Sequence, residues 1–336
     1  MAGSPRSRLS IHRGMLLTAL AALALATPAK AAPVATSLTL AVSPNPVPVN
    51  GVVTVSGTLS QATGGIPGKP IEISVTPPGG PRTVRANVTT GASGQFSYGD
   101  PIPLTAAGTY VYEARWSGDT SYAASTRTAA VAVMRALPVV SLGVSPLTVD
   151  YKRQARVTVN VSGASSGAVS IYATPLGGVR TLIGAGALNS LGNLSASLTM
   201  TRTALLVAEY GGSSTHSAAA SAGKIVQVRA IARARLRGGY GRAGKYRLYR
   251  LGARPRVTGT VTPNHAGSPL AFVAQKSVRG AWRTMATSTF PIDASGSAYA
   301  VLRRASRGVW RVRTVFKGDA DHLGDRSPWK YLRVTR

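Results

Sequence analysis

The sequence contains no cysteine among its 336 residues, and it has only four histidines and ten acidic residues against 39 Lys and Arg. The lack of cysteine excludes disulfide bonds, thiolate catalysis, thiolate metal ligands and a lipid-modified cysteine. Each folding unit must therefore be held together by its apolar core. Ten dispersed acids also give no readable carboxylate pair of the kind that glycoside hydrolysis requires.

Residues 1–32 have the pattern of an export signal. A basic start is followed by an apolar run over residues 15–26 and by small residues at 29–31. This apolar run is shorter than the roughly 20 residues that a helix needs to cross a bilayer. We therefore expect residues 1–32 to be cleaved and the rest to be secreted, and retention of this segment as an anchor is the alternative.

Helical periodicity is nearly absent from the remaining chain, whereas apolar and polar residues alternate in many short segments. In Thr109–Trp116, for example, Tyr110, Tyr112, Ala114 and Trp116 fall on one face. A period of two places these side chains on one side of a β-strand. The sequence therefore predicts strands with one buried face.

This strand pattern recurs twice with its phase intact. Ala204–Tyr210 and Trp310–Phe316 repeat it, so that Trp116, Tyr210 and Phe316 occupy equivalent positions. Self-similarity of this kind defines a repeating unit. Short strands separated by Gly, Pro, Asn and Asp turns indicate antiparallel sandwiches. We predict an all-β protein of three tandem β-sandwiches, over residues 33–135, 136–229 and 230–336, joined by short connections into an elongated rod.

The segment Tyr110–Tyr122, with its Trp116-Ser-Gly-Asp119 turn, resembles the penultimate strand and following turn of bacterial immunoglobulin-like domain repeats. Gly308–Arg313 and Gly318–Asp321 resemble the same family in exported bacterial proteins. The second unit departs from the pattern, with Ser213 at the aspartate position and His216 at the tyrosine position. The resemblance implies immunoglobulin-like sandwiches, which serve as adhesins, spacers or accessory modules beside enzymes.

Candidate chemical sites are few. No Gly-x-Ser-x-Gly elbow supplies a nucleophile, so we predict a protein without enzymatic activity and without a catalytic residue. His216 and His322 follow equivalent turns, which favours a structural role. We predict no cofactor and no metal, although Asp319, Asp321 and Asp325 offer the oxygen ligands that calcium prefers. The preferred interpretation of Asp319 is an Asx turn equivalent to that of Asp119.

The tryptophans separate into two groups. Trp116 and Trp310 have the inward phase of their strands and are expected in the core, as is Phe316. Trp282 lies beside a turn-like Arg-Gly pair, and Trp329 follows Ser-Pro. These two are the candidates for aromatic contact with a ligand.

Charge is distributed unevenly along the chain. Residues 33–135 carry 6 Lys and Arg against 4 acids, residues 136–229 carry 7 against 2, and residues 230–336 carry 22 against 4. A surface this basic concentrates polyanions and binds them by counterion release. The predicted anion-binding residues crowd the start of the third unit, interleaved with tyrosines: Arg233, Arg235, Arg237, Arg242, Lys245, Arg247, Arg250, Arg254 and Arg256.

The sequence thus predicts a non-enzymatic exported binding or adhesion protein. Its first two units would be spacers, and its basic third unit would contact an anionic cell-wall polymer, an acidic glycan or extracellular nucleic acid. A protein partner is a further option, and a small-molecule substrate is not expected. No wall-sorting tail is recognised, so attachment to a wall would be non-covalent. The alternatives are a structural or accessory module without its own ligand, and a hydrolase on a divergent sandwich.

Overall fold

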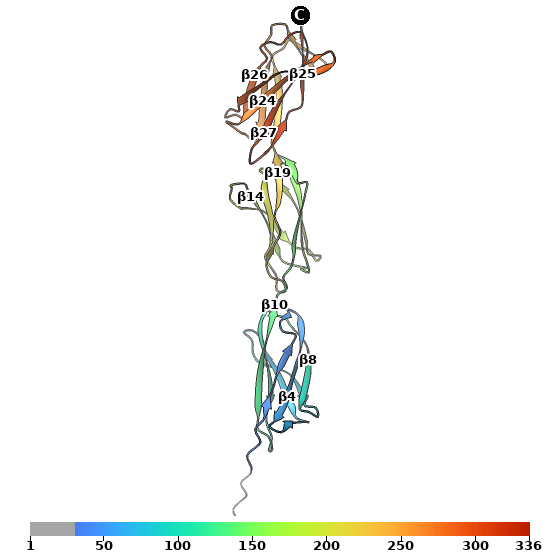
Figure 1. The fold of residues 1–336 in the computed structure, drawn as a ribbon, viewed down its shortest axis with the longest axis vertical. Coiled ribbons are helices and arrows are strands. Elements are labelled where there is room, and N and C mark those ends of the chain that lie inside the picture. Colours follow the sequence, from blue (N-terminus) through green and yellow to red (C-terminus); the bar gives the residue numbers. More distant parts are fainter. Residues whose placement is uncertain (1–30) are drawn as a thin grey trace, which may run out of the picture.

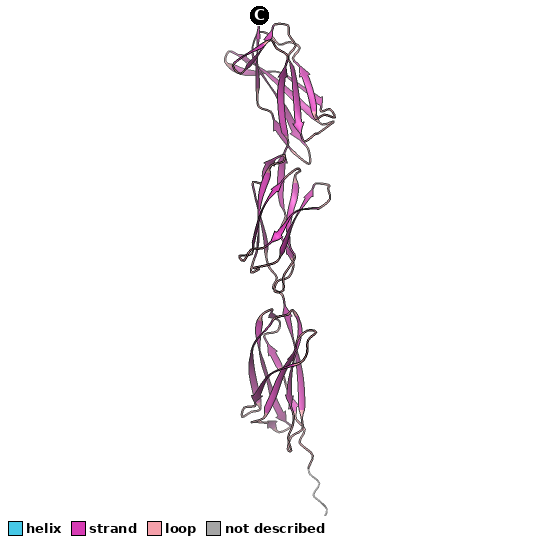
Figure 2. Ribbon diagram, turned by 180° about the vertical axis from the view of Figure 1, so that it is seen from behind, coloured by secondary structure: helices cyan, strands magenta, loops and turns pink. Residues whose placement is uncertain are grey.

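The computed structural model describes residues 31–336, which form strands, turns and loops and contain no helix. No membrane-crossing helix therefore exists among these residues. The predicted export signal lies almost entirely in residues 1–30, outside the described part. The all-β class predicted from the sequence is confirmed. Three sandwiches follow one another end to end, and the C-terminus lies at the far end of the last one (Figures 1 and 2).

The first sandwich packs two sheets of strands against one apolar core between residues 38 and 133. The sheet centred on β4 comprises β1 (Ser37–Leu38), β2 (Ala41–Ser43), β4 (Gly51–Gln61), β5 (Gly64–Gly65) and β8 (Gln95–Leu104). The opposite sheet comprises β3 (Val47–Pro48), β6 (Pro70–Thr76), β7 (Thr83–Thr89), β9 (Gly108–Trp116) and β10 (Ser125–Met134).

The second sandwich repeats this layout around a core between residues 140 and 228. Its smaller sheet comprises β11 (Val140–Ser145), β13 (Gln154–Val161) and β16 (Asn193–Thr199). Its larger sheet comprises β12 (Thr148–Asp150), β14 (Ala168–Pro175), β15 (Thr181–Ala187), β17 (Ala204–Tyr210), β18 (Ala219–Ala220) and β19 (Lys224–Arg229).

The third sandwich encloses a core between residues 230 and 334. Its smaller sheet comprises β20 (Ile231–Arg237), β23 (Arg256–Thr262) and β26 (Ser297–Val301). Its larger sheet comprises β21 (Gly241–Ala243), β22 (Tyr246–Arg250), β24 (Pro269–Val278), β25 (Ala281–Pro291), β27 (Gly308–Gly318), β28 (Leu323–Arg326) and β29 (Lys330–Thr335). The pairing of β28 with β19 makes it continuous with the larger sheet of the second sandwich. Each of the three cores lies inside one of the predicted domain ranges, while independent folding of those ranges stays a prediction.

The alternation that identified the repeat matches the burial of side chains. In β9 the four residues with the inward phase, from Tyr110 to Trp116, are buried. Tyr210 ends the equivalent strand β17 and is also buried, as are Trp310 and Phe316 in β27. The period of two therefore placed these aromatic side chains correctly in the core.

The turn after each of these strands is also repeated. Asp119 Oδ1 accepts backbone N–H bonds from the residues two and three positions later, at 2.8 Å each. Asp319 Oδ1 does the same at 2.9 and 2.8 Å. In the second sandwich the hydroxyl of Ser213 takes this role at 3.3 and 3.1 Å. The predicted Asx turns are present, and a serine substitutes for the aspartate in the second sandwich.

The same turns join the sandwiches to one another. Ala136, in the first connection, exchanges backbone hydrogen bonds with Thr215 and Ser217 of the second sandwich, at 2.9 Å each. In the second connection the N–H of Ala230 donates to the carbonyl of Leu323 at 3.0 Å, and Arg229 pairs with Leu323 in a parallel bridge. Consecutive sandwiches are therefore linked through backbone pairing at each joint.

Candidate anion-binding surface

The predicted anion-binding residues lie on both sheets of the third sandwich. Arg233, Arg235 and Arg237 occupy the outward phase of β20, where every second residue is buried. Arg256 of β23 is paired with Arg237 across the sheet and lies 3.8 Å from the ring centre of Tyr299. These four arginines share the outer face of the smaller sheet.

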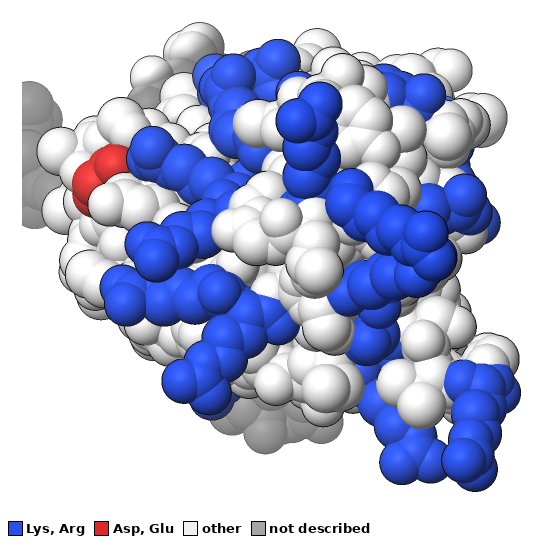
Figure 3. Space-filling model, turned by 90° about the horizontal axis from the view of Figure 1, so that it is seen from above, with Lys and Arg blue, Asp and Glu red and all other residues white. Residues whose placement is uncertain are grey.

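The remaining predicted residues belong to the hairpin of β21 and β22 and to the loop that follows it. Arg242, Lys245, Arg250 and Arg254 are exposed, whereas Arg247 is half-buried and donates from Nε to the carbonyl of Gly238. The hairpin is the edge of the larger sheet. The structure therefore does not gather the nine predicted residues on one sheet face. Seen from the C-terminal end of the molecule, Lys and Arg dominate the visible surface (Figure 3).

The two predicted surface tryptophans are brought together by an arginine that the sequence did not single out. The guanidinium of Arg311, on β27, lies 4.4 Å from the ring centre of Trp282 and 4.2 Å from that of Trp329. Arg313, two residues later on the same strand, lies 4.4 Å from Trp329. Both tryptophans are partly exposed. Cations stacked on aromatic faces at these distances interact favourably with the ring quadrupole.

This group continues across the sheet as a row of directly opposed residues. Gln275 of β24, Arg311, Tyr331 of β29 and Tyr246 of β22 are successive partners in register. Arg311 Nε donates to Gln275 Oε1 at 2.8 Å, and the rings of Tyr246 and Tyr331 meet edge to face at 5.9 Å. Strand pairing thus aligns the side chains of four strands into one row on the outer face of the larger sheet.

Further cations lie along this row. The ammonium of Lys245 lies 4.5 Å from the ring centre of Tyr331, and the guanidinium of Arg333 lies 4.9 Å from that of Tyr246. We use the name arginine–aromatic face for the partly or fully exposed residues that form this surface: Lys245, Tyr246, Trp282, Arg311, Arg313, Trp329, Tyr331 and Arg333.

The arginine–aromatic face has no neutralising carboxylate among the described residues. Burial, followed by the charges of Arg326 and Arg311, lowers the pKa of Arg313. The Nε of Arg313 is buried and has no hydrogen-bond partner in the described chain. Crowded cations are favourable surroundings for an anion, because an anion relieves the repulsion between them.

The contrast with the first sandwich is direct. There, Lys69 pairs with Asp119 at 2.6 Å, and Arg82 bridges Glu72 and Glu113 at 2.6 and 2.8 Å. In the third sandwich none of the 22 Lys and Arg residues, all of which are described, forms an ion pair with an acid. The charge of this sandwich is therefore available for external anions.

The sequence interpretation missed Arg311, Arg313 and Arg333 because it searched for a dense run of arginines. A usable signal was present, since Arg311 and Arg313 have the outward phase between Trp310 and the buried residues that follow it. The proximity of Trp282 to Trp329 was not readable, because it depends on the pairing of β25, β24, β27 and β29.

The three acids considered for calcium are engaged separately. Asp321 lies 3.5 Å from Arg202 Nε, and Asp325 accepts the backbone N–H of Ala232 at 2.8 Å. Asp319 is instead grouped with two histidines: its Oδ2 lies 2.8 Å from His265 Nδ1, and its Oδ1 lies 3.9 Å from His322 Nδ1. The sequence did not associate His265 with this turn.

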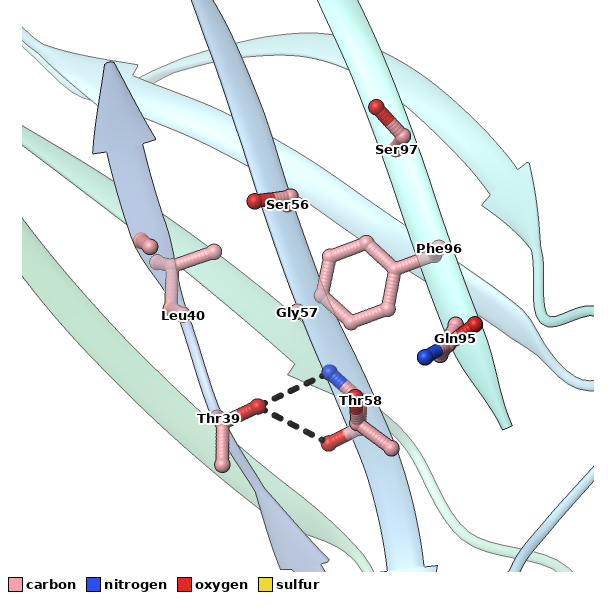
Figure 4. Close-up of a pocket in the computed structure, with 9 residues that line it drawn as sticks. Thr39, Leu40, Ser56, Gly57, Thr58, Gln95, Phe96 and Ser97 are labelled. Atoms are coloured by element: carbon pink, nitrogen blue, oxygen red, sulfur yellow. Dashed lines mark hydrogen bonds between the residues drawn. The ribbon is translucent and has the colours of Figure 1, made fainter. Parts of the chain in front are cut away.

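Two hollows were not anticipated. One lies in the first sandwich above Gly57, where Phe96 covers the strand and Thr39 Oγ1 accepts the N–H of Thr58 at 2.9 Å (Figure 4). Its lining has no titratable side chain. The other is a groove of about 830 Å³ in the third sandwich, lined by aromatic, aliphatic and charged side chains such as Phe290, Val257 and Arg303. The absence of a small-molecule substrate stays a prediction.

No family model matches the chain, and no curated protein sequence matches it either. Similar solved structures include the Escherichia coli adhesin FdeC, at 16% identity and a TM-score of 0.32, over 90% of this chain and 97% of that one. The Yersinia pseudotuberculosis adhesin InvE is similar at 13% identity and a TM-score of 0.30, over 57% and 59% of the two chains.

Trypsin-activated α2-macroglobulin from Escherichia coli is similar at 12% identity and a TM-score of 0.27. This chain aligns over 90% of its own length and spans 23% of that protein. At these identities and TM-scores the similarities carry no argument about function. They place bacterial adhesins among the all-β structures that the chain resembles.

Proposed function

We propose that this chain is an exported, non-enzymatic binding protein of the bacterial immunoglobulin-like type. In this proposal residues 1–32 are a cleaved signal, and the sandwiches over 33–135 and 136–229 are spacers. The sandwich over 230–336 contacts an anionic surface or polymer outside the cell, to which the protein is held non-covalently.

The arginine–aromatic face is the observation that carries this proposal. It combines guanidinium groups, which bind phosphate, sulfate or carboxylate, with rings on which a planar or apolar ligand surface can stack. The row crosses β24, β27, β29 and β22 at right angles to the strands. Because adjacent strands lie about 4.8 Å apart, such a row offers repeated contacts to an extended polymer rather than one enclosed pocket.

The chemistry shared by the candidate ligands is a chain of regularly spaced anions. Wall polymers, acidic glycans and single-stranded nucleic acid all satisfy it, and an acidic protein segment would do so as well. Nucleic acid would also use the rings, since bases stack on aromatic side chains and guanidinium planes. The intrinsic fluorescence of Trp282 and Trp329 distinguishes these ligands, because base stacking quenches it whereas a polymer without aromatic groups does not stack.

The test uses the chain from residue 33 to 336 on immobilised heparin, with single-stranded DNA and an anionic wall preparation as further matrices, at physiological salt. We expect retention by the unmodified chain and earlier elution by the triple variant Arg311→Gln, Arg313→Gln, Arg333→Gln. A triple variant of the opposite sheet, Arg233→Gln, Arg235→Gln, Arg237→Gln, measures how much the other basic face contributes to retention.

The matched control removes three unpaired, exposed cations from the second sandwich: Arg153→Gln, Arg156→Gln and Lys224→Gln. Its charge changes by the same amount, so it should elute with the unmodified chain if the third sandwich makes the contact. Absence of retention on all three matrices at physiological salt would favour a structural module without its own ligand. Equal effects of all three triple variants would show attraction by net charge alone.

A further inference from the structure

Two histidines and an aspartate meet at the joint between the second and third sandwiches. His265 lies in the connection before β24, and Asp319 and His322 lie in the turn after β27. One ligand atom from each of the three residues can be chosen so that all lie within 4.8 Å of one another. This cluster is separate from the arginine–aromatic face, and none of its members takes part in that surface.

The cluster contains a buried nitrogen that is ready to bind a cation. His322 Nε2 lies 2.8 Å from the carbonyl oxygen of Thr201 in the second sandwich. Because a carbonyl can only accept, Nε2 carries the proton, and in a neutral ring Nδ1 then holds the lone pair. The side chain is 4% exposed, and Nδ1 has no hydrogen-bond partner in the described chain. A metal-ligating histidine typically donates its other N–H to a backbone carbonyl in this way.

Asp319 is held in place as an anionic ligand. Its Oδ1 accepts the N–H groups of Asp321 and His322, and its Oδ2 faces His265 Nδ1. The His265 side chain is 6% exposed, and its Nε2 also lacks a partner in the described chain.

The spacing of these atoms suits a small transition-metal ion. Zinc bonds of about 2.0 to 2.1 Å in a tetrahedral site place neighbouring ligand atoms about 3.3 Å apart. His265 Nδ1 lies 2.8 Å from Asp319 Oδ2, and His322 Nδ1 lies 3.9 Å from Asp319 Oδ1, so the two nitrogens approach different oxygens of one carboxylate. Small side-chain rotations would bring both nitrogens and one carboxylate oxygen to the tetrahedral spacing. The Asp319 side chain is 37% exposed, which leaves access for a water molecule as a fourth ligand.

Comparison among the three sandwiches shows that this combination is not a property of the turn itself. In each sandwich the carbonyl just before β6, β14 or β24 accepts an equivalent backbone N–H, from Thr90, Leu188 or Ile292, respectively. The residue three positions before that carbonyl is Ile66 in the first sandwich, Ala164 in the second and His265 in the third. The position of His322 is held by Tyr122 in the first sandwich and His216 in the second. In the described chain only the third sandwich combines two imidazoles and a carboxylate at these positions.

We propose that His265, Asp319 and His322 bind one first-row divalent transition-metal ion, of which Zn²⁺ is the reference case. Two nitrogen donors and one oxygen donor match zinc, whereas calcium requires a cage of oxygen atoms. The bound ion stiffens the joint, because His322 is bonded to Thr201 and its neighbour Asp321 accepts the backbone N–H of Thr203 at 2.8 Å. The site thereby couples the orientation of the third sandwich to metal binding.

The test is calorimetric titration of the chain from residue 33 to 336 with Zn²⁺ alone, followed by titration with Ca²⁺. We expect one Zn²⁺ per chain and no competition by Ca²⁺. His265→Gln and Asp319→Asn should each weaken Zn²⁺ binding at least about tenfold, since even the partners of metal ligands contribute 10- to 100-fold. The asparagine keeps the Oδ1 acceptor of the turn. His216→Gln, at the equivalent turn of the second sandwich, is the matched control and should bind as the unmodified chain does.

A second measurement needs no variant at the site. The chain after residue 32 has three histidines, so its imidazole ¹H–¹⁵N spectrum is simple. Addition of one equivalent of Zn²⁺ should shift the signals of His265 and His322 and leave those of His216 in place. The proposal is overturned if Zn²⁺ shifts none of them, if it acts on His216 alone, or if Asp319→Asn binds Zn²⁺ as tightly as the unmodified chain.

Discussion

The salt dependence of polyanion binding is the most direct measure of the arginine–aromatic face. Replacement of Arg311, Arg313 and Arg333 by glutamine removes three cations that have no internal counterion and leaves the row of aromatic rings in place. Each guanidinium that contacts a phosphate releases condensed counterions, which makes the affinity fall as salt rises. The variant should therefore bind more weakly and depend less on salt.

The magnitude follows from the number of phosphates that the variant no longer neutralises. For single-stranded nucleic acid the slope of log affinity against log salt is about −0.7 per neutralised phosphate, so three fewer such phosphates reduce the slope by about 2. When salt rises from 50 to 200 mM, both proteins lose affinity. The factor by which the unmodified chain weakens should be about 20 times the factor by which the variant weakens.

Fluorescence anisotropy of a labelled oligothymidylate across that salt range provides both slopes. The control variant Arg153→Gln, Arg156→Gln, Lys224→Gln should keep the slope of the unmodified chain, since those cations lie in the second sandwich. The assignment of the arginine–aromatic face fails if its triple variant retains the full slope, or if the slope of the control decreases as much as that of the triple variant.

Three further predictions concern other residues. Trp282→Ala and Trp329→Ala should each abolish part of the fluorescence quenching by single-stranded DNA and weaken binding by about 1 to 3 kcal/mol, the range for one stacked base; unchanged quenching in both would contradict stacking. Gly57→Ala should destabilise the protein by about 1 to 3 kcal/mol in urea unfolding, because its Cβ would lie 2.1 Å from the Thr39 carbonyl oxygen; a neutral effect would mean that this strand pair can separate. Burial and a hydrogen bond to a carboxylate raise the pKa of Tyr112. The folded state therefore keeps this proton as pH rises above the ordinary value of 10.0, and stability falls there; Tyr112→Phe should make that decline shallower by up to about 1.4 kcal/mol per pH unit, and an identical pH profile would argue against the bonded phenol.

The fold class was readable from the sequence because period-two alternation and burial are two descriptions of the same geometry. In β9 and β27 every aromatic residue with the inward phase is buried, including Trp116, Trp310 and Phe316. The turns were readable for a related reason: an aspartate three positions before a tyrosine or histidine caps two backbone amides locally. Such interactions need only neighbouring residues.

The candidate sites were only partly readable because they depend on pairing across strands. The predicted arginines of β20 and of the β21–β22 hairpin are close in sequence but belong to different sheets. Trp282 and Trp329 are far apart in sequence, and only the order β25-β24-β27-β29 brings both of them against Arg311. The contact between His265 and Asp319 was not readable from the sequence, because it links two loops at the same end of the sandwich.

The two proposals for the third sandwich depend on different residues. The arginine–aromatic face requires cations that are free of internal partners, whereas the histidine cluster requires a carboxylate that is held firmly in a turn. Asp319→Asn removes one negative charge and touches no member of the arginine–aromatic face, so it should leave polyanion binding intact or slightly strengthen it. Conversely, loss of Arg311, Arg313 and Arg333 leaves all three proposed metal ligands in place. Because the cluster bonds to Thr201 of the second sandwich, a bound ion would act on where the basic surface points and not on its affinity for each anion.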